Sequence, residues 1–140
     1  MCLGVCKGEG TILLIDDEVL LLDVGMEMLE YMGYKVLKAE GGREAIEIFT
    51  RHKNQIDMVI LDMIMPDMGG GETYDRLKEV SPDVKVLLST GYSMEGEAVE
   101  IMKRGCNGFI QKPFDIEQLS ISVRDILQER NGAPGGKAIG

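Results

Sequence analysis

The feature that most constrains the fold is a regular alternation between short apolar runs and longer segments with apolar residues at helical spacing. The runs have the length of strands and cover residues 11–15, 35–39, 57–61, 84–89 and 108–111. The helical segments follow them, one ending at Gly33 and the others covering residues 42–51, 70–80, 93–104 and 115–128. Strands that alternate with helices predict an α/β fold, in which helices cover both faces of a parallel sheet.

The polarity of each run predicts its place in that sheet. Residues 35–39 include two lysines and are expected at an edge, whereas residues 11–15, 57–61 and 84–89 are more apolar and are expected near the centre. With right-handed crossovers, this pattern corresponds to a doubly wound, flavodoxin-like sheet of five strands in the order 2-1-3-4-5, with five helices. Such a sheet binds its ligand at the carboxyl ends of strands 1 and 3, where the strand order reverses.

The first helical segment has one apolar stripe that is expected to face the sheet. It consists of Leu21, Val24, Met28, Leu29 and Met32. Gly25 lies within the same helix, where a glycine costs about 1 kcal/mol, and we expect it to permit close packing.

Both ends of the chain differ from the middle. The first ten residues hold three of the 18 glycines and the last ten hold four, and neither end has a hydrophobic period. We interpret residues 1–10 and 129–140 as flexible segments, with one folded domain between them at residues 11–128. The length of 140 residues suits one domain, and the twelve residues after Gln128 are too few for an output domain.

Composition argues against several classes of function. Asp and Glu number 24 against 15 Lys and Arg, and the formal charge of −9 disfavours binding to nucleic acid or anionic lipid. No apolar run approaches the roughly 18 residues of a membrane span, and charged residues come too early for a signal peptide. We therefore predict a cytoplasmic protein without membrane contact. Three cysteines and the single His52 do not suit a disulfide framework or a four-ligand zinc site.

Polar residues of a restricted kind follow four of the expected strands. Asp16 and Asp17 follow the first strand, Asp62 the third, Thr90 the fourth and Lys112 the fifth. Taken singly, each has a structural explanation, since acids suit helix N-termini and the other residues suit turns or the surface. Because parallel strands end at one edge of the sheet, we expect the five side chains to converge there.

The converging groups predict a particular chemistry. Three carboxylates placed close together repel one another, and a divalent cation removes that cost. Mg²⁺ prefers oxygen ligands, a lysine supplies a compact positive charge, and a threonine hydroxyl can donate to an oxyanion. This set is typical of phosphoryl transfer by positioning and charge neutralisation. Asp62, at the end of a central strand, is the candidate nucleophile and would form an aspartyl phosphate.

Four motifs carry a resemblance to a known family. They are Asp16-Asp17-Glu18, Asp62-Met63-Ile64-Met65-Pro66-Asp67-Met68-Gly69-Gly70, Ser89-Thr90-Gly91-Tyr92 and Gly108-Phe109-Ile110-Gln111-Lys112-Pro113-Phe114. In order and spacing, the sequence resembles the receiver domain of two-component response regulators over residues 11–128. The resemblance implies a phosphorelay protein that takes a phosphoryl group from a sensor histidine kinase or a histidine phosphotransfer domain. It also implies that the chain catalyses only its own phosphorylation and dephosphorylation. The resemblance does not identify the downstream protein target.

The resemblance implies a role for each member of the acidic cluster. Asp62 would accept the phosphoryl group from a phosphohistidine. Mg²⁺, or Mn²⁺ in its place, would bind Asp17, Asp62 and the backbone carbonyl of Ile64. Asp16 would act largely through a metal-bound water. Lys112 would pair with Asp62 and then with the phosphoryl group.

The resemblance also implies a switch. Thr90 would move to bond a phosphoryl oxygen, and Phe109 would swing inward behind it, with ordinary core packing as the alternative role for Phe109. Phosphorylation would favour one of two arrangements of the face formed by the fourth strand, the following helix and the fifth strand. A cis peptide bond is expected between Lys112 and Pro113.

Two positions are expected to tune the lifetime of the phosphoryl group. Ile64 lies two residues after Asp62, and Tyr92 lies two residues after Thr90. In the family that this sequence resembles, residues at these positions border the path of the attacking water. A large apolar group and an aromatic ring there would hinder the water, which predicts slow self-dephosphorylation.

Two other functions share parts of the pattern. A metal-dependent phosphohydrolase with an aspartyl nucleophile would have a general acid two residues after that nucleophile, where Ile64 cannot transfer a proton. A flavin-binding module would have a Gly-, Ser- or Thr-rich phosphate loop after the first strand, where Asp16-Asp17-Glu18 would repel phosphate. Within the receiver family, residues 67–72 and 105–111 resemble C-terminal receivers of hybrid sensor histidine kinases, with a stand-alone receiver as the alternative.

Overall fold

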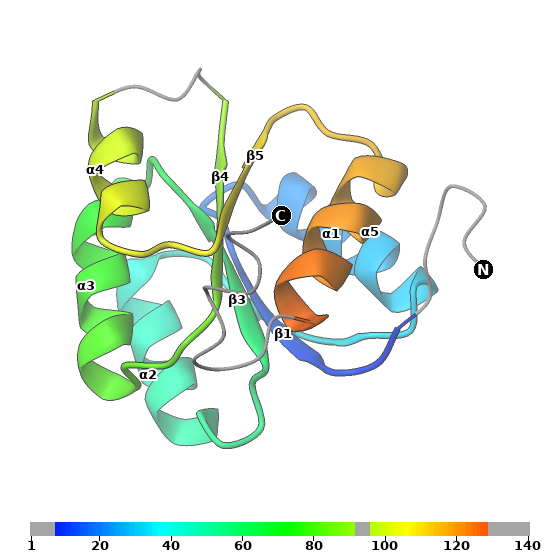
Figure 1. Cartoon of the computed structure of the whole chain (residues 1–140), viewed down its shortest axis with the longest axis horizontal. Coiled ribbons are helices and arrows are strands. Elements are labelled where there is room, and N and C mark those ends of the chain that lie inside the picture. The colour runs from blue at the N-terminus through cyan, green and yellow to red at the C-terminus, as the bar shows by residue number, and fades with distance from the viewer. Residues whose placement is uncertain (1–7, 92–95, 129–140) are drawn as a thin grey trace.

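The protein is a three-layer α/β domain with one parallel sheet (Figure 1). The computed structural model describes residues 8–91 and 96–128. The strands are β1 (Thr11–Ile15), β2 (Lys35–Ala39), β3 (Met58–Asp62), β4 (Val86–Thr90) and β5 (Gly108–Gln111). They pair in the order β2-β1-β3-β4-β5, and every pair is parallel. The predicted fold class and strand order are therefore confirmed.

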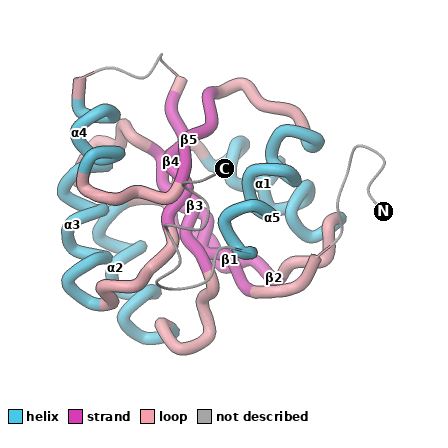
Figure 2. Tube along the Cα trace, viewed as in Figure 1, coloured by secondary structure: helices cyan, strands magenta, loops and turns pink. Residues whose placement is uncertain are grey.

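Five helices cover the two faces of this sheet. They are α1 (Val19–Tyr31), α2 (Gly42–His52), α3 (Gly70–Val80), α4 (Glu97–Lys103) and α5 (Ile116–Gln128). Figures 1 and 2 show α1 and α5 on one side of the sheet and α2, α3 and α4 on the other. No helix in the described part of the chain is both long and apolar enough to cross a membrane.

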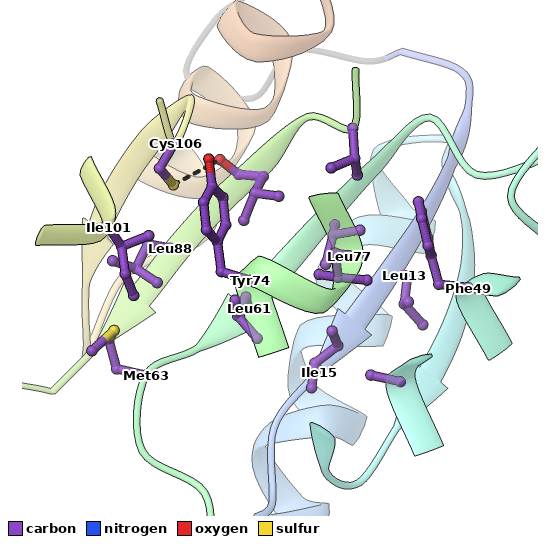
Figure 3. Close-up of a cluster of buried hydrophobic side chains, with 14 of the residues drawn as sticks. Leu13, Ile15, Phe49, Leu61, Met63, Tyr74, Leu77, Leu88, Ile101 and Cys106 are labelled. Carbon is purple, nitrogen blue, oxygen red and sulfur yellow. Dashed lines mark hydrogen bonds between the residues drawn. The ribbon is translucent and has the colours of Figure 1, made fainter. Parts of the chain in front are cut away.

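The sheet separates two hydrophobic cores because alternate residues of a strand face opposite sides. On β1, Leu13 and Ile15 face α2 and α3, while Ile12 and Leu14 face α1 and α5. Figure 3 shows the first core, in which Tyr74 of α3 lies beside strand residues. Burial on both faces explains why the central strands are mostly apolar, with polar residues at their carboxyl ends.

The buried stripe of α1 differs from the predicted one. Leu21 and Val24 are 40% and 47% exposed, so their predicted place in the core is wrong. Leu22 and Gly25 face the sheet instead. A Cβ at position 25 would lie 2.9 Å from Leu14 Cδ2, so the helix rests its glycine against β1. The close packing predicted for Gly25 is confirmed, and so is the inward position of Met28, Leu29 and Met32 in the predicted stripe.

Some element boundaries also differ from those predicted. The strand expected at residues 84–89 begins at Val86, because Val84 N–H donates to Ser81 O and closes the turn after α3. The helix expected from residue 93 begins at Glu97, after Gly96 with a φ of 60° that ends any helix running through it. Residues 93–95 of that expectation lie outside the described residues, as do positions 1–7 and 129–140 of the expected flexible ends.

Candidate functional site

The carboxyl ends of four parallel strands bring the predicted polar residues to one edge of the sheet. Asp62 is the last residue of β3 and pairs with Ser89 of β4. Thr90 ends β4, and its carbonyl accepts a hydrogen bond of 2.7 Å from the backbone N–H of Lys112 after β5. Asp16 follows β1 directly. The strand register therefore fixes the relative positions of these residues before any side-chain contact is made.

Three carboxylates form a cluster at this edge. Ligand oxygens of Asp16, Asp17 and Asp62 all lie within 4.8 Å of one another. Asp16 and Asp62 are buried, whereas Asp17 is exposed. The backbone N–H of Glu18 donates to Asp16 Oδ1 at 3.0 Å, which orients that carboxylate. The predicted convergence of the three acids is confirmed.

A lysine joins two of these carboxylates. Lys112 Nζ donates to Asp16 Oδ2 at 2.7 Å and to Asp62 Oδ1 at 2.9 Å. The lysine is partly buried, and both acceptors are nearly enclosed. Charge-assisted hydrogen bonds of this length are strong, so Lys112 holds the two acids in fixed positions.

The electrostatics of the cluster are unbalanced. Burial raises the pKa of Asp62 to about 6, and the negative charges of Asp16 and Asp17 add to this, against the opposing hydrogen bond from Lys112. Burial also disfavours the charge of Lys112, but its hydrogen bonds to Asp16 and Asp62 outweigh this and raise the pKa of the lysine. One ammonium group is thus too little to neutralise three neighbouring acids.

The donor set fits a hard divalent cation. Carboxylate oxygens are the ligands that Mg²⁺ prefers, and three of them lie close enough to contribute to one site. Burial is the main cause of the raised pKa of Asp62, and the charges of Asp16 and Asp17 add to it. A cation bound between the three carboxylates would favour their ionised forms. Within the described residues, no other group of three potential metal ligands gathers in this way.

The other predicted residues that the structure describes lie on β4 and β5 and in the loops that follow β3 and β5. Thr90 is buried at the end of β4, and Phe109 on β5 is half-buried against the core shared by α3 and α4. Ile64 is 59% exposed in the loop after β3. The bond between Lys112 and Pro113 is cis, as expected. The expectation for Tyr92 lies outside the described residues.

One contact near the site was missed by the reasoning from sequence. The carboxylate of Asp67, in the loop after β3, accepts hydrogen bonds from the backbone N–H groups of Gly42 and Arg43. A carboxylate that caps a helix from another element leaves no local spacing pattern. The adjacent glycines Gly41 and Gly42 were the available signal, since they allow a close approach to the start of α2.

Comparison with known proteins identifies the family. The family model for the response regulator receiver domain matches residues 12–124, and the chain belongs to this family. The chain is 32% identical over 125 residues to the sensor kinase CckA of Brucella abortus, covering 89% of this chain and 13% of the kinase. It is 28% identical over 116 residues to the response regulator SaeR of Staphylococcus aureus, covering 83% of this chain and 50% of SaeR. The chain therefore spans half or less of these two relatives.

Solved structures agree with this assignment. A response regulator receiver domain from Clostridium thermocellum superposes with a TM-score of 0.80 at 35% sequence identity, covering 84% of this chain and 94% of that one. A CheY-like receiver domain from Methanospirillum hungatei gives a TM-score of 0.77 at 26% identity, covering 86% and 94%. The predicted receiver function in two-component systems is confirmed, and it takes precedence over the phosphohydrolase and flavin alternatives.

Proposed function

We propose that Asp62 is the phosphoacceptor of this receiver domain. The observation that carries the proposal is the difference between the two buried acids. Asp16 uses both oxygens, one with Glu18 N–H and the other with Lys112. Among the described residues, the side-chain hydrogen bonds of Asp62 engage Oδ1 alone. Of the two buried acids, Asp62 is therefore the one with a carboxylate oxygen, Oδ2, available to attack phosphorus.

The residues around Asp62 are suited to hold Mg²⁺. Asp17 and Asp62 would be direct ligands together with the backbone carbonyl of Ile64, and Asp16 would act through a bound water. Their close spacing supports this assignment. The cation would supply charge neutralisation for the acids and for the incoming phosphoryl group.

The proposed reaction transfers the phosphoryl group from a histidine of the donor to Asp62. Asp62 Oδ2 forms a bond to phosphorus while the phosphorus–nitrogen bond to the donor histidine breaks, and the electron pair of that bond returns to the imidazole. Lys112, already 2.9 Å from Asp62 Oδ1, can turn to a phosphoryl oxygen without leaving the site. The Thr90 hydroxyl would bond another phosphoryl oxygen. The domain thus catalyses its own phosphorylation and, with water as the acceptor, its own dephosphorylation.

Phosphorylation would act through the face that contains β4, α4 and β5. Thr90 ends β4, and Phe109 lies on the neighbouring strand, with Leu88 as its Cα partner. A movement of Thr90 toward the phosphoryl group would open space that Phe109 can enter. The two arrangements of this face would then differ in population according to the phosphorylation of Asp62.

The donor would be a sensor histidine kinase or a histidine phosphotransfer domain. The match to the sensor kinase CckA supports a hybrid kinase as the natural context of this receiver. Phosphotransfer profiling against purified candidate kinases tests the assignment, since a cognate kinase transfers its phosphoryl group much faster than unrelated ones.

Labelling with a small-molecule donor tests the proposed function. We expect acetyl phosphate and Mg²⁺ to phosphorylate the wild-type chain and not the Asp62→Asn variant, because an amide cannot act as the nucleophile. Excess EDTA should abolish the labelling of the wild type. Asp83→Asn is the matched control, because Asp83 is exposed and lies in the turn before β4, away from the site. Full labelling of Asp62→Asn at the same site would refute the proposal.

A further inference from the structure

The loop after β3 is fastened to the start of α2 by a single carboxylate. Asp67 Oδ1 accepts a hydrogen bond from Gly42 N–H at 3.1 Å, and Oδ2 accepts one from Arg43 N–H, also at 3.1 Å. The first N–H groups of a helix have no partner within the helix. Asp67 satisfies two of them from a position 24 and 25 residues away in the sequence.

Two glycines make this contact sterically feasible. A Cβ on Gly41 would lie 2.8 Å from Asp67 Oδ1, and a Cβ on Gly42 would lie 2.7 Å from Met68 Cβ. Side chains at these positions would push the loop away from the helix. The N–H group of Arg43, together with that of Gly42, lowers the pKa of Asp67, so the carboxylate is ionised and accepts both hydrogen bonds at neutral pH.

The fastened loop is the one that carries the carbonyl of Ile64. Gly70 N–H donates to Met63 O at 2.9 Å and closes the base of the loop. The side chains of Met65 and Met68 are buried beneath it. Ile64 itself is exposed and lies between this closed base and Asp67. The position of its carbonyl therefore depends on where the loop is anchored.

The same corner of the fold contacts the other half of the acidic cluster. Ala39, the last residue of β2, accepts a hydrogen bond of 3.2 Å from the backbone N–H of Asp16. Residues 39–43 thus bond to the loop that carries Asp16 and Asp17 on one side and to Asp67 on the other. This corner bridges the two loops that supply the candidate metal ligands.

We propose that Asp67 is a positioning residue for the phosphoryl-transfer site, which fixes the carbonyl of Ile64 relative to Asp16 and Asp62 by anchoring the loop to α2. This inference rests on the proposed function, because it assigns Asp67 to the same metal and phosphoryl site. Asp67 acts through the backbone of the loop and does not itself contact the metal. Its loss weakens Mg²⁺ binding and slows phosphorylation.

The matched control is another acid at the same corner. Glu44, in the first turn of α2, accepts a hydrogen bond of 2.7 Å at its Oε1 from the backbone N–H of Glu40, just before the helix. Its hydrogen bond therefore stays on the α2 side of the contact. Glu44→Ala and Asp67→Ala each remove one exposed carboxylate and its backbone hydrogen bonds. Asp67→Asn keeps one acceptor oxygen and therefore one of the two hydrogen bonds, which makes it the milder variant.

The experiment measures Mg²⁺ affinity by calorimetric titration and the rate of phosphorylation by acetyl phosphate at saturating Mg²⁺, with urea midpoints recorded in parallel. We expect Asp67→Ala to weaken Mg²⁺ binding about tenfold, as is typical for loss of a group that orients metal ligands, and to slow phosphorylation. Asp67→Asn should fall between that variant and the wild type, and Glu44→Ala should bind Mg²⁺ as the wild type does.

Equal Mg²⁺ affinities in Asp67→Ala, Glu44→Ala and the wild type would overturn the proposal and leave Asp67 as a helix cap alone. If Asp67→Ala does not fold, the Mg²⁺ affinity of Asp67→Asn is compared instead, and an affinity equal to that of the wild type would overturn the proposal in the same way. A wild-type chain that neither binds Mg²⁺ nor is phosphorylated would instead count against the proposed function. The two failures are thus distinguished by the behaviour of the wild type.

Discussion

Replacing the phosphoacceptor with its neutral isostere should stabilise the fold. In the folded protein the pKa of Asp62 is raised from 3.8 to about 6, chiefly by burial. The folded state therefore resists ionisation of this group, while the unfolded chain does not. Asp62→Asn keeps the size of the side chain and removes the charge. We expect the variant to be more stable than the wild type at neutral pH in the absence of divalent cations.

The magnitude follows from the pKa difference. Roughly two pKa units correspond to about 3 kcal/mol, which is the upper bound for the gain in free energy of unfolding. The protonated form of Asp62 is favoured in the folded state. The free energy of unfolding of the wild type is therefore highest with respect to this group below pH 3.8, and that stabilisation is lost as the pH rises through about 6. The advantage of Asp62→Asn should therefore be absent near pH 4 and complete near pH 7.5. Lys112 remains paired with Asp16 in the variant.

Urea unfolding followed by circular dichroism, in EDTA and at several pH values, measures this difference. At neutral pH we expect a gain of about 1–3 kcal/mol, which corresponds to a rise of roughly 3–15 °C in the thermal midpoint. Asp83→Asn, an exposed Asp-to-Asn change, controls for the effect of net charge. A neutral or destabilising effect of Asp62→Asn near pH 7.5, or a gain that does not change with pH, would refute the electrostatic description of the cluster.

Three further predictions concern the metal, the loop and the lifetime of the phosphoryl group. Mg²⁺ should raise the thermal midpoint of the wild type and do so less for Asp62→Asn, and equal shifts in the two would place the metal elsewhere. Gly70→Ala should cost about 1–3 kcal/mol in urea unfolding, because its Cβ would lie 2.9 Å from Met63 Cα and O, whereas Gly69→Ala meets nothing within 4 Å and should be nearly neutral. Ile64→Asn combined with Tyr92→Ala should speed loss of the phosphoryl group, and an unchanged half-life would disprove the hindrance assigned to these side chains.

The fold was predictable because its determinants are local. The central strands are short apolar runs because helices cover both their faces, and β2, with its two lysines, tolerates the more exposed edge of the sheet. The orientation of α1 was not predictable in the same way. Its sequence offers apolar residues on more than one side, and the contact of Gly25 with Leu14 decides which side faces the sheet. That contact is a property of tertiary packing, which periodicity does not contain.

The acidic cluster was predictable for a topological reason. Parallel strands bring Asp16, Asp62 and Lys112 to one edge whatever the details of packing, and a resemblance to receiver domains assigns their roles. The hydrogen bonds that distinguish Asp16 from Asp62 depend on the turn at Glu18 and required the structure. The link from Asp67 to α2 also required it, since Gly41 and Gly42 indicate a close approach at the start of the helix but do not say which distant residue makes it.

Mapping the phosphoryl group on the chain tests the central claim most directly. The wild-type protein is treated with acetyl phosphate and Mg²⁺, the acyl phosphate is reduced with borohydride to homoserine, and the modified peptide is sequenced by mass spectrometry. We predict conversion of Asp62 and no conversion of Asp16 or Asp17, whose oxygens would be occupied by Lys112, by backbone or by the cation. Homoserine at Asp16 or Asp17 with Asp62 intact would contradict the assignment of the phosphoacceptor.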